Sequence, residues 1–191
     1  MTQAEIKQLI QKQRTFFHSG ATLDVEYRIH ALQKLKACIL KYENEINIAL
    51  RADLGKCAFE SYMCETGLVL SELTYMLKHT RKFAKERTVR TPLAQFHSRS
   101  YQKPSPYGVT LIMSPWNYPF MLTIDPLIDA LAAGNTAILK PSAYSAHTTA
   151  LISRMIQECF DEKYVAVVTG GREENNFLLN EHFDYIFFTG S

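Results

Sequence analysis

The stretch YGVTLIMSPWNYPFMLTIDPLIDALAAGNTAIL, residues 107–139, decides the fold of this chain. It opens with a short apolar run that ends at Met113, continues with a helical pattern over 119–133, and closes with a second apolar run over 136–139. A strand, a helix and a following strand in this order build a right-handed βαβ unit on a parallel sheet. The stretch therefore predicts an α/β fold.

The same alternation continues toward the C-terminus. A helical pattern over 145–160 is followed by apolar runs over 164–168 and 184–188. Four short strands with helices between them predict a Rossmann-like parallel sheet of the nucleotide-binding type over 105–191. We expect this domain to be truncated after its fourth strand, with an uncovered sheet edge that makes the isolated chain prone to aggregation.

The residues before this sheet carry helical periodicity. Thr2 and Glu5 form a capping-box pattern for a first helix that ends near Ser19, and two further patterns cover 24–54 and about 60–85. We expect residues 1–88 to form a helical segment that packs on the sheet domain. Residues 89–104 are rich in Thr, Ser, Arg and aromatic residues, which predicts extended strands that connect the two parts.

Composition excludes several classes of protein. Hydrophobic residues make up 47% of the chain and charged residues 21%, as in soluble globular proteins. The net charge is +2 and no basic cluster is interleaved with aromatic residues, so we expect no nucleic-acid partner. No apolar run approaches the roughly 20 residues of a membrane-spanning helix, and the N-terminus lacks a signal-peptide pattern. These features favour a cytoplasmic protein.

The cysteines and histidines do not have the spacing of metal ligands. Zinc sites pair their cysteines at short intervals, whereas the histidines here are scattered singly. We predict no metal site, and we predict reduced, packed thiols at Cys38, Cys57, Cys64 and Cys159.

The carboxyl ends of the predicted strands are the expected ligand site, because open parallel sheets bind ligands there. The segments that follow the four strands are 114–119, 140–142, 169–171 and 189–191. The dinucleotide fingerprint G-x-G-x-x-G is absent after the first strand, which disfavours a standard Rossmann dehydrogenase. Main-chain N–H groups of Gly190 and Ser191 could supply the anion site for a pyrophosphate instead.

Four linked motifs occur in the order found in aldehyde dehydrogenases. They are Pro115-Trp116-Asn117-Tyr118-Pro119, Ala132-Ala133-Gly134-Asn135-Thr136, Lys140-Pro141-Ser142 and Phe187-Phe188-Thr189-Gly190-Ser191. The chain therefore resembles this superfamily over essentially its whole length. The stretches Asp53-Leu54-Gly55-Lys56 and Glu60-Ser61-Tyr62 are similar to the class 3 branch, for fatty and aromatic aldehydes, and particularly to its bacterial members.

The resemblance implies NAD(P)-dependent oxidation of a small-molecule aldehyde to a carboxylate through a cysteine hemithioacetal and thioester. Asn117 corresponds to the family residue whose side-chain amide stabilises the oxyanion, a task that suits a neutral N–H donor. Spacing alone favours Asn117 as a turn former. The family's nucleophilic cysteine and general-base glutamate lie downstream of Thr-Gly-Ser, and no cysteine here matches the nucleophile. We therefore expect this chain alone to be inactive.

The resemblance also implies a cofactor groove. Lys140 corresponds to the family lysine that binds hydroxyls of the adenosine ribose, although the pattern alone favours a solvated lysine. Trp116 would line the groove with its ring face, with packing in the core as the alternative. The implied cofactor-binding set is Met113, Ser114, Trp116, Lys140, Ser142, Gly190 and Ser191.

Two further positions bear on specificity. Tyr62 corresponds to an aromatic residue beside the substrate tunnel of class 3 relatives, with a place in the helical core as the alternative. Many relatives carry Glu after Lys-Pro-Ser, whereas this chain has Ala143. The missing carboxylate would otherwise repel a 2′-phosphate, so we expect either NAD or NADP as the cofactor.

Three hypotheses remain open for the function. The first is the leading part of a complete class 3-like aldehyde dehydrogenase, which by resemblance would be a homodimer with residues 89–104 as a bridging element. The second is a non-catalytic nucleotide-binding or interaction protein. The third is a CoA-acylating aldehyde dehydrogenase of the same superfamily, which would release an acyl thioester.

Overall fold

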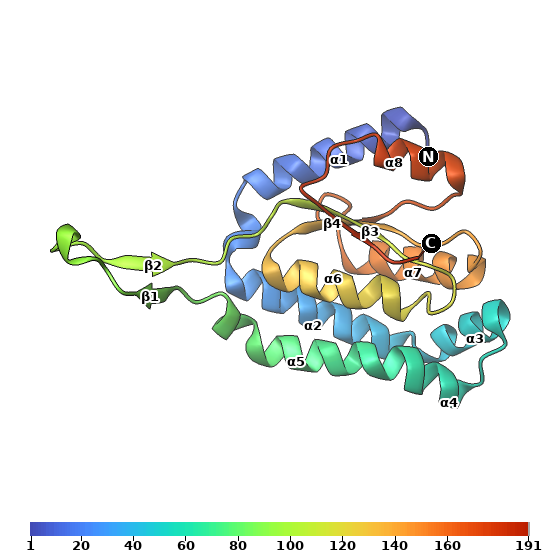
Figure 1. The fold of residues 1–191 in the computed structure, drawn as a ribbon. Helices are drawn as coiled ribbons and strands as arrows, with labels where there is room; N and C mark the ends of the chain where they lie inside the picture. Colours follow the sequence, from blue (N-terminus) through green and yellow to red (C-terminus); the bar gives the residue numbers. More distant parts are fainter. Residues whose placement is uncertain (191) are drawn as a thin grey trace.

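A parallel sheet of four strands lies at the centre of the computed structural model, which describes residues 1–190 (Figure 1). Its strands are β3 (Val109–Met113), β4 (Thr136–Lys140), β5 (Val165–Val167) and β6 (Tyr185–Phe188), in the order β5-β4-β3-β6. At the two ends of β3, Val109 lies opposite Thr136 of β4 and Met113 lies opposite Phe188 of β6. The predicted α/β fold with a parallel sheet is confirmed.

The side chains of the strands alternate between two apolar layers. Ile112 and Leu139 face the larger layer, which is built with α2 (Val25–Lys41), α3 (Glu43–Leu54), α5 (Gly67–Phe83), α6 (Met121–Ala133) and α7 (Ala146–Cys159). Leu111 and Ile138 face the other layer, where α1 (Gln3–His18) and α8 (Arg172–Leu179) cover the sheet (Figure 1). This alternation follows from the two-residue period of a strand, and it buries β3 and β4 at every residue.

The N-terminal region is helical, as predicted. Thr2 and Glu5 form the expected capping box of α1, each side chain accepting from the backbone N–H of the other residue. The pattern over 24–54 divides into α2 and α3. The region from about 60 is not one continuous helix, because α4 (Ala58–Ser61) runs into a π-helical turn, Tyr62–Thr66, before α5 begins. A π turn is a local insertion that apolar periodicity does not reveal.

The sequence pattern does not predict α8. This helix follows Gly170-Gly171 and begins with the polar run REENN, and of its residues only Leu178 is buried. Its start is nevertheless well defined, because Gly171 N donates a hydrogen bond of 2.7 Å to Glu174 Oε2. The short apolar stripe explains why periodicity missed the helix.

A two-stranded antiparallel hairpin projects from the body of the molecule (Figure 1). Strand β1 (Arg87–Val89) pairs with β2 (Ser100–Gln102), and a short 3-10 turn, Leu93–Gln95, lies between them. Of the extended strands predicted over 89–104, β2 lies within that range, whereas β1 begins before it, at Arg87. Leu93 and Phe96 are strongly exposed, so the hairpin presents apolar side chains that nothing within residues 1–190 covers.

Strand β6 forms the exposed edge that the sequence predicts. Within residues 1–190 it pairs only with β3, and Tyr185, Ile186 and Phe188 are exposed. An apolar edge strand of this kind is a template for pairing with another strand. The aggregation of the isolated chain stays a prediction.

None of the helices within residues 1–190 combines the length and the apolar character that crossing a membrane requires. In the same residues, no three or more His, Cys, Asp or Glu side chains gather closely enough to hold a metal ion.

Candidate active site

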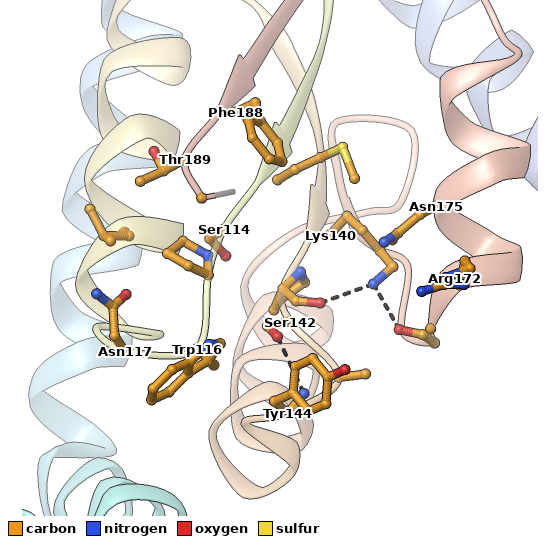
Figure 2. Close-up of a pocket in the computed structure, with 18 residues that line it drawn as sticks. Ser114, Trp116, Asn117, Lys140, Ser142, Tyr144, Arg172, Asn175, Phe188 and Thr189 are labelled. Carbon is orange, nitrogen blue, oxygen red and sulfur yellow. Dashed lines mark hydrogen bonds between the residues drawn. The ribbon is translucent and has the colours of Figure 1, made fainter.

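A cavity of about 770 Å³ lies at the carboxyl ends of the parallel strands. The chain runs from β3 to β4 and β5 on one side, and β6 then returns to the other side of β3. Ligands of open α/β sheets bind at such a change of direction, because the loops on either side diverge there. The cavity brings together the predicted residues Met113, Ser114, Trp116, Asn117, Lys140, Ser142 and Gly190 (Figure 2).

The loop after β3 is anchored by Ser114. Its N–H donates to Lys140 O at 3.3 Å, and its hydroxyl lies 2.5 Å from Thr123 Oγ1, which in turn donates to Pro119 O at 2.6 Å. The Ser114 side chain is buried, and this network uses its hydroxyl. Ser114 therefore shapes the cavity wall mainly by holding the loop.

Asn117 lines the cavity with an oriented side-chain amide. Its Oδ1 accepts a hydrogen bond of 3.1 Å from Tyr118 N, and within residues 1–190 no acceptor is paired with its Nδ2. Because the oxygen is tied to the backbone, the N–H donors are the part of the amide left for a ligand. The turn-forming and oxyanion-binding interpretations of Asn117 are thus compatible.

Two residues that sequence reasoning missed hold this loop from behind. Lys56 Nζ donates to Asn117 O at 3.1 Å and lies 2.5 Å from Glu65 Oε1. Glu65 Oε2 accepts from Phe120 N at 2.8 Å and Met121 N at 3.2 Å, where α6 begins. Lys56 was recognised only as part of a motif, and a single carboxylate within a helical pattern gave no signal for Glu65.

Lys140 is buried at the end of β4, with an exposed fraction of only 3%. Its Nζ donates to Pro141 O at 3.0 Å and to Gly170 O at 2.8 Å (Figure 2). Burial lowers the pKa of the Lys140 ammonium group, and the nearby charge of Glu174 partly opposes this shift. The alternative of a solvated lysine is wrong, and since an ammonium group carries three N–H donors, one remains for a ligand.

Trp116 and Tyr144 are exposed aromatic residues that line the cavity. Trp116 is 53% exposed, so the alternative of core packing is wrong. A large exposed ring beside a cavity can cover the flat face of a ligand. Tyr144 was not identified from the sequence, because it lies in a turn without a distinctive pattern.

Ser142 and Gly190 form parts of the cavity wall. Ser142 Oγ accepts from Tyr144 N at 3.2 Å, which forms a turn after β4. Gly190 has a φ of 141°, a conformation that residues with a side chain rarely adopt. Ser191 lies outside the described residues, so the predicted anion site is described only at Gly190.

The start of α8 adds polar groups that the sequence did not indicate. Arg172 and Asn175 line the cavity on the same side as Lys140 (Figure 2). Asn175 Oδ1 is buried and has no hydrogen-bond partner within residues 1–190. No acidic residue is among the described residues that line the cavity, and Ala143 is part of this lining. Lys140 and Arg172 are the basic residues that line this end of the cavity, and Glu174, outside the lining, acts electrostatically on Lys140.

Tyr62 is not part of the cavity wall. It lies on the π-helical turn and is 47% exposed, so the alternative of a core residue is wrong.

The four cysteines also lie away from the cavity. Cys38 and Cys159 are buried between helices, Cys57 is exposed and Cys64 is half-buried, and none of them lines the cavity.

Comparison with known proteins agrees with this geometry. The family model described as "Aldehyde dehydrogenase family" matches residues 1–191. The chain is 44% identical over 186 residues to 4,4'-diaponeurosporen-aldehyde dehydrogenase of Staphylococcus aureus, covering 97% of this chain and 40% of that protein. It is 36% identical to aldehyde dehydrogenase family 3 member A2 of Rattus norvegicus, covering 95% and 38%. It is 37% identical to the dimeric NADP-preferring aldehyde dehydrogenase of Canis lupus familiaris, covering 98% and 42%.

A solved structure described as the substrate-bound state of Staphylococcus aureus AldH superposes with a TM-score of 0.95 at 44% identity. The alignment covers 97% of this chain and 41% of that structure. The chain thus spans about 40% of the length of the curated relatives that it matches. The match over every residue and the shared fold lead to one conclusion: the chain belongs to the aldehyde dehydrogenase family.

Proposed function

We propose that the cavity binds NAD or NADP and that the complete protein oxidises an aldehyde to a carboxylate. The single observation that carries this proposal is that Asn117 and Lys140, which follow the carboxyl ends of the neighbouring strands β3 and β4, line one cavity. The membership of the family supports the reaction type. The residues of the cavity support the cofactor.

The cavity fits a dinucleotide in three respects. Lys140 offers a buried donor, the unpartnered Asn175 Oδ1 offers a buried acceptor, and Trp116 offers an exposed ring face. A buried polar atom without a partner is costly, which favours a ligand or ordered water that satisfies it. In this proposal Lys140 and Asn175 bind hydroxyl groups of the cofactor, and Trp116 covers part of it.

Asn117 is proposed to act on the aldehyde. When a thiolate adds to a carbonyl, negative charge develops on the oxygen, and an amide N–H stabilises that charge without competing as an acid. The bond from Tyr118 N to Asn117 Oδ1 keeps the donor face of the amide available. When bound, the cofactor supplies the acceptor for the hydride that leaves the substrate carbon.

The nucleophile is proposed to come from outside residues 1–191. None of the four cysteines lines the cavity, and the family resemblance assigns the nucleophilic cysteine and the general-base glutamate to a region downstream. The 191-residue chain would then bind cofactor without turning over substrate. The same proposal divides the chain into two parts. Residues 1–88 would form a helical support, and residues 105–191 would form the cofactor domain.

Use of NADP beside NAD is proposed from the charge of the cavity. Lys140 and Arg172 provide positive charge. Position 143 carries Ala in place of the carboxylate that the family resemblance implies, so no negative charge there repels a 2′-phosphate. One of the relatives described above is NADP-preferring by name.

Homodimer formation is proposed from the hairpin, because the exposed Leu93 and Phe96 provide an apolar surface suited to a second copy.

The test uses the polypeptide that carries residues 1–191 together with the sequence that follows them in its gene. Calorimetry would measure the affinities for NAD and NADP, and absorbance would follow the aldehyde-dependent appearance of the reduced cofactor. We expect micromolar binding of at least one cofactor and turnover that Asn117→Ala reduces about 10²–10³-fold. Absence of binding to either cofactor would contradict the proposal.

A non-catalytic nucleotide-binding role is the second candidate, favoured by the absence of a cysteine from the cavity wall described here. Cofactor binding without turnover by the longer polypeptide would support it. Product analysis with and without coenzyme A separates carboxylate release from acyl thioester formation, and so tests the CoA-acylating alternative.

A further inference from the structure

A buried ion pair lies behind the loop that carries Asn117. The side chain of Lys56 is 8% exposed and that of Glu65 is not exposed at all, and Nζ lies 2.5 Å from Oε1. Neither residue lines the cavity. The remaining hydrogen bonds of both groups nevertheless run to the segment from Asn117 to Met121.

We propose that Lys56 and Glu65 are positioning residues for Asn117, which set the direction of its side-chain amide and balance the charge beneath it. The inference rests on the proposed role of Asn117 as the oxyanion donor. It adds two residues that touch neither substrate nor cofactor.

The two residues hold the loop from both ends. Lys56 Nζ donates to Asn117 O at 3.1 Å, and it lies 4.2 Å from the centre of the Tyr118 ring. Glu65 Oε2 accepts from Phe120 N at 2.8 Å and Met121 N at 3.2 Å. The backbone is thus held at Asn117 and again three and four residues later. A side chain whose backbone is held on both sides has few directions open to it.

Local structure brings the two side chains to this place. Lys56 follows Gly55, which ends α3 in the left-handed conformation with a φ of 71° and lets the chain leave the helix. Glu65 lies on the π-helical turn between α4 and α5. Single π turns occur often at functional sites, because the added residue changes which side chains face a neighbouring element.

The charges of the pair have a further consequence. The first N–H groups of a helix lack partners within the helix, and a carboxylate accepts from them strongly. An unpaired carboxylate below the loop would also oppose negative charge that develops near Asn117. The ammonium group of Lys56 neutralises Glu65, so the loop gains a strong acceptor without a net negative charge beneath the oxyanion site.

The experiment compares Glu65→Gln and Lys56→Met with a matched control in the longer polypeptide. The control is Glu162→Gln, which makes the same chemical change in the exposed pair of Lys12 and Glu162. Hydrogen–deuterium exchange is measured on the peptide that covers residues 117–122, together with kcat for an aldehyde and the Kd of the cofactor. Lys56→Arg keeps the charge and serves as the conservative variant.

We expect Glu65→Gln and Lys56→Met to speed exchange in that peptide at least tenfold, and to lower kcat about 10–100-fold with cofactor Kd changed less than twofold. Glu162→Gln should leave the exchange rate, kcat and the cofactor Kd unchanged. Lys56→Arg should retain most of kcat. Unchanged exchange at residues 117–122 in Glu65→Gln would overturn the proposal, as would a loss of cofactor affinity equal to the loss of kcat.

A double substitution tests whether Glu65 acts through Asn117. If it does, adding Glu65→Gln to Asn117→Ala should lower kcat less than twofold further, because the group that it positions is already gone. Independent, multiplicative losses would overturn the proposal. If Asn117→Ala alone leaves kcat unchanged, the proposed function of Asn117 fails, and the exchange measurement still decides whether Lys56 and Glu65 hold the loop.

Discussion

Two buried lysines lie beside the same cavity, and their partners differ. Lys56 is paired with the buried carboxylate of Glu65, whereas Lys140 donates to the carbonyl oxygens of Pro141 and Gly170. The charge of Lys56 is therefore paired within the protein. Lys140 has no carboxylate in direct contact within residues 1–190, although Glu174 acts on it from farther away, and its ammonium group keeps a free donor. Burial alone does not distinguish the two lysines, but the chemistry of their partners does, and this difference supports the proposed ligand-binding role of Lys140.

The largest effect is expected when Lys56 loses its partner. In Glu65→Ala a buried ammonium group is left without a carboxylate, and two N–H groups at the start of α6 lose their acceptor. We expect the free energy of unfolding of the longer polypeptide, measured with urea, to fall by about 3–5 kcal/mol. The exposed counterpart, Glu162→Ala, should lower it by less than about 1 kcal/mol. Similar losses of unfolding free energy in both variants would mean that burial of the Lys56–Glu65 pair does not set its contribution to stability.

Removing the charge of Lys140 should affect binding more than folding. We expect Lys140→Met to weaken NAD binding about 10–100-fold in calorimetry, because a charged donor to the ligand is lost. The free energy of unfolding should change by only about 1 kcal/mol, since the loss of two hydrogen bonds to carbonyl oxygens is partly offset by removal of a buried charge. Lys12→Met, at an exposed site, is the control. If the NAD affinity is unaltered, Lys140 is a structural residue like Lys56.

The charge environment of Lys140 can be altered at Ala143. A carboxylate introduced by Ala143→Glu should repel a 2′-phosphate, so we expect the ratio of NADP to NAD affinity to fall about tenfold. Ala143→Gln has nearly the same size without the charge, and it should leave the ratio close to that of the parent protein. A fall of the same size in Ala143→Gln would assign the effect to shape instead of charge.

The smallest effect concerns Asp125, a half-buried carboxyl group that, unlike Glu65, has no ion-pair partner within residues 1–190. Burial, with the charges of Glu72 and Asp129, raises the pKa of Asp125 on α6 to about 7, and its Oδ1 has no hydrogen-bond partner within residues 1–190. The unfolded chain releases this proton near pH 4, so the folded state binds more protons between about pH 4 and 7. The stability contributed by this group is present below pH 4 and is lost as pH rises to about 7.

Asp125→Asn removes the ionisation altogether. We expect it to raise the free energy of unfolding at pH 8 by about 1 kcal/mol and to leave it nearly unchanged at about pH 3, where the carboxyl group is largely protonated in both states. Urea denaturation at the two pH values measures this difference. An equal effect at both values would mean that ionisation of Asp125 does not contribute.

Much of the fold could be predicted because its signals are local. The apolar runs of β3 to β6, the caps of α1 and the glycine that ends α6 each lie within a few residues of sequence. α8 was missed because only one of its residues is buried, and the π turn was missed because it interrupts a periodic pattern. The motif residues Asn117 and Lys140 were found by resemblance, and their side-chain environments were not.

The sequence by itself determined the α/β fold, the order of its elements and the family motifs, because short-range patterns specify them. Only the tertiary structure decided that Trp116 is exposed and Lys140 buried, and that Lys56 and Glu65 meet beneath the Asn117 loop. The contacts of that pair join residues 61 and 55 positions apart. Buried charges must be satisfied by whatever partner the fold brings near them, and no local pattern records that partner.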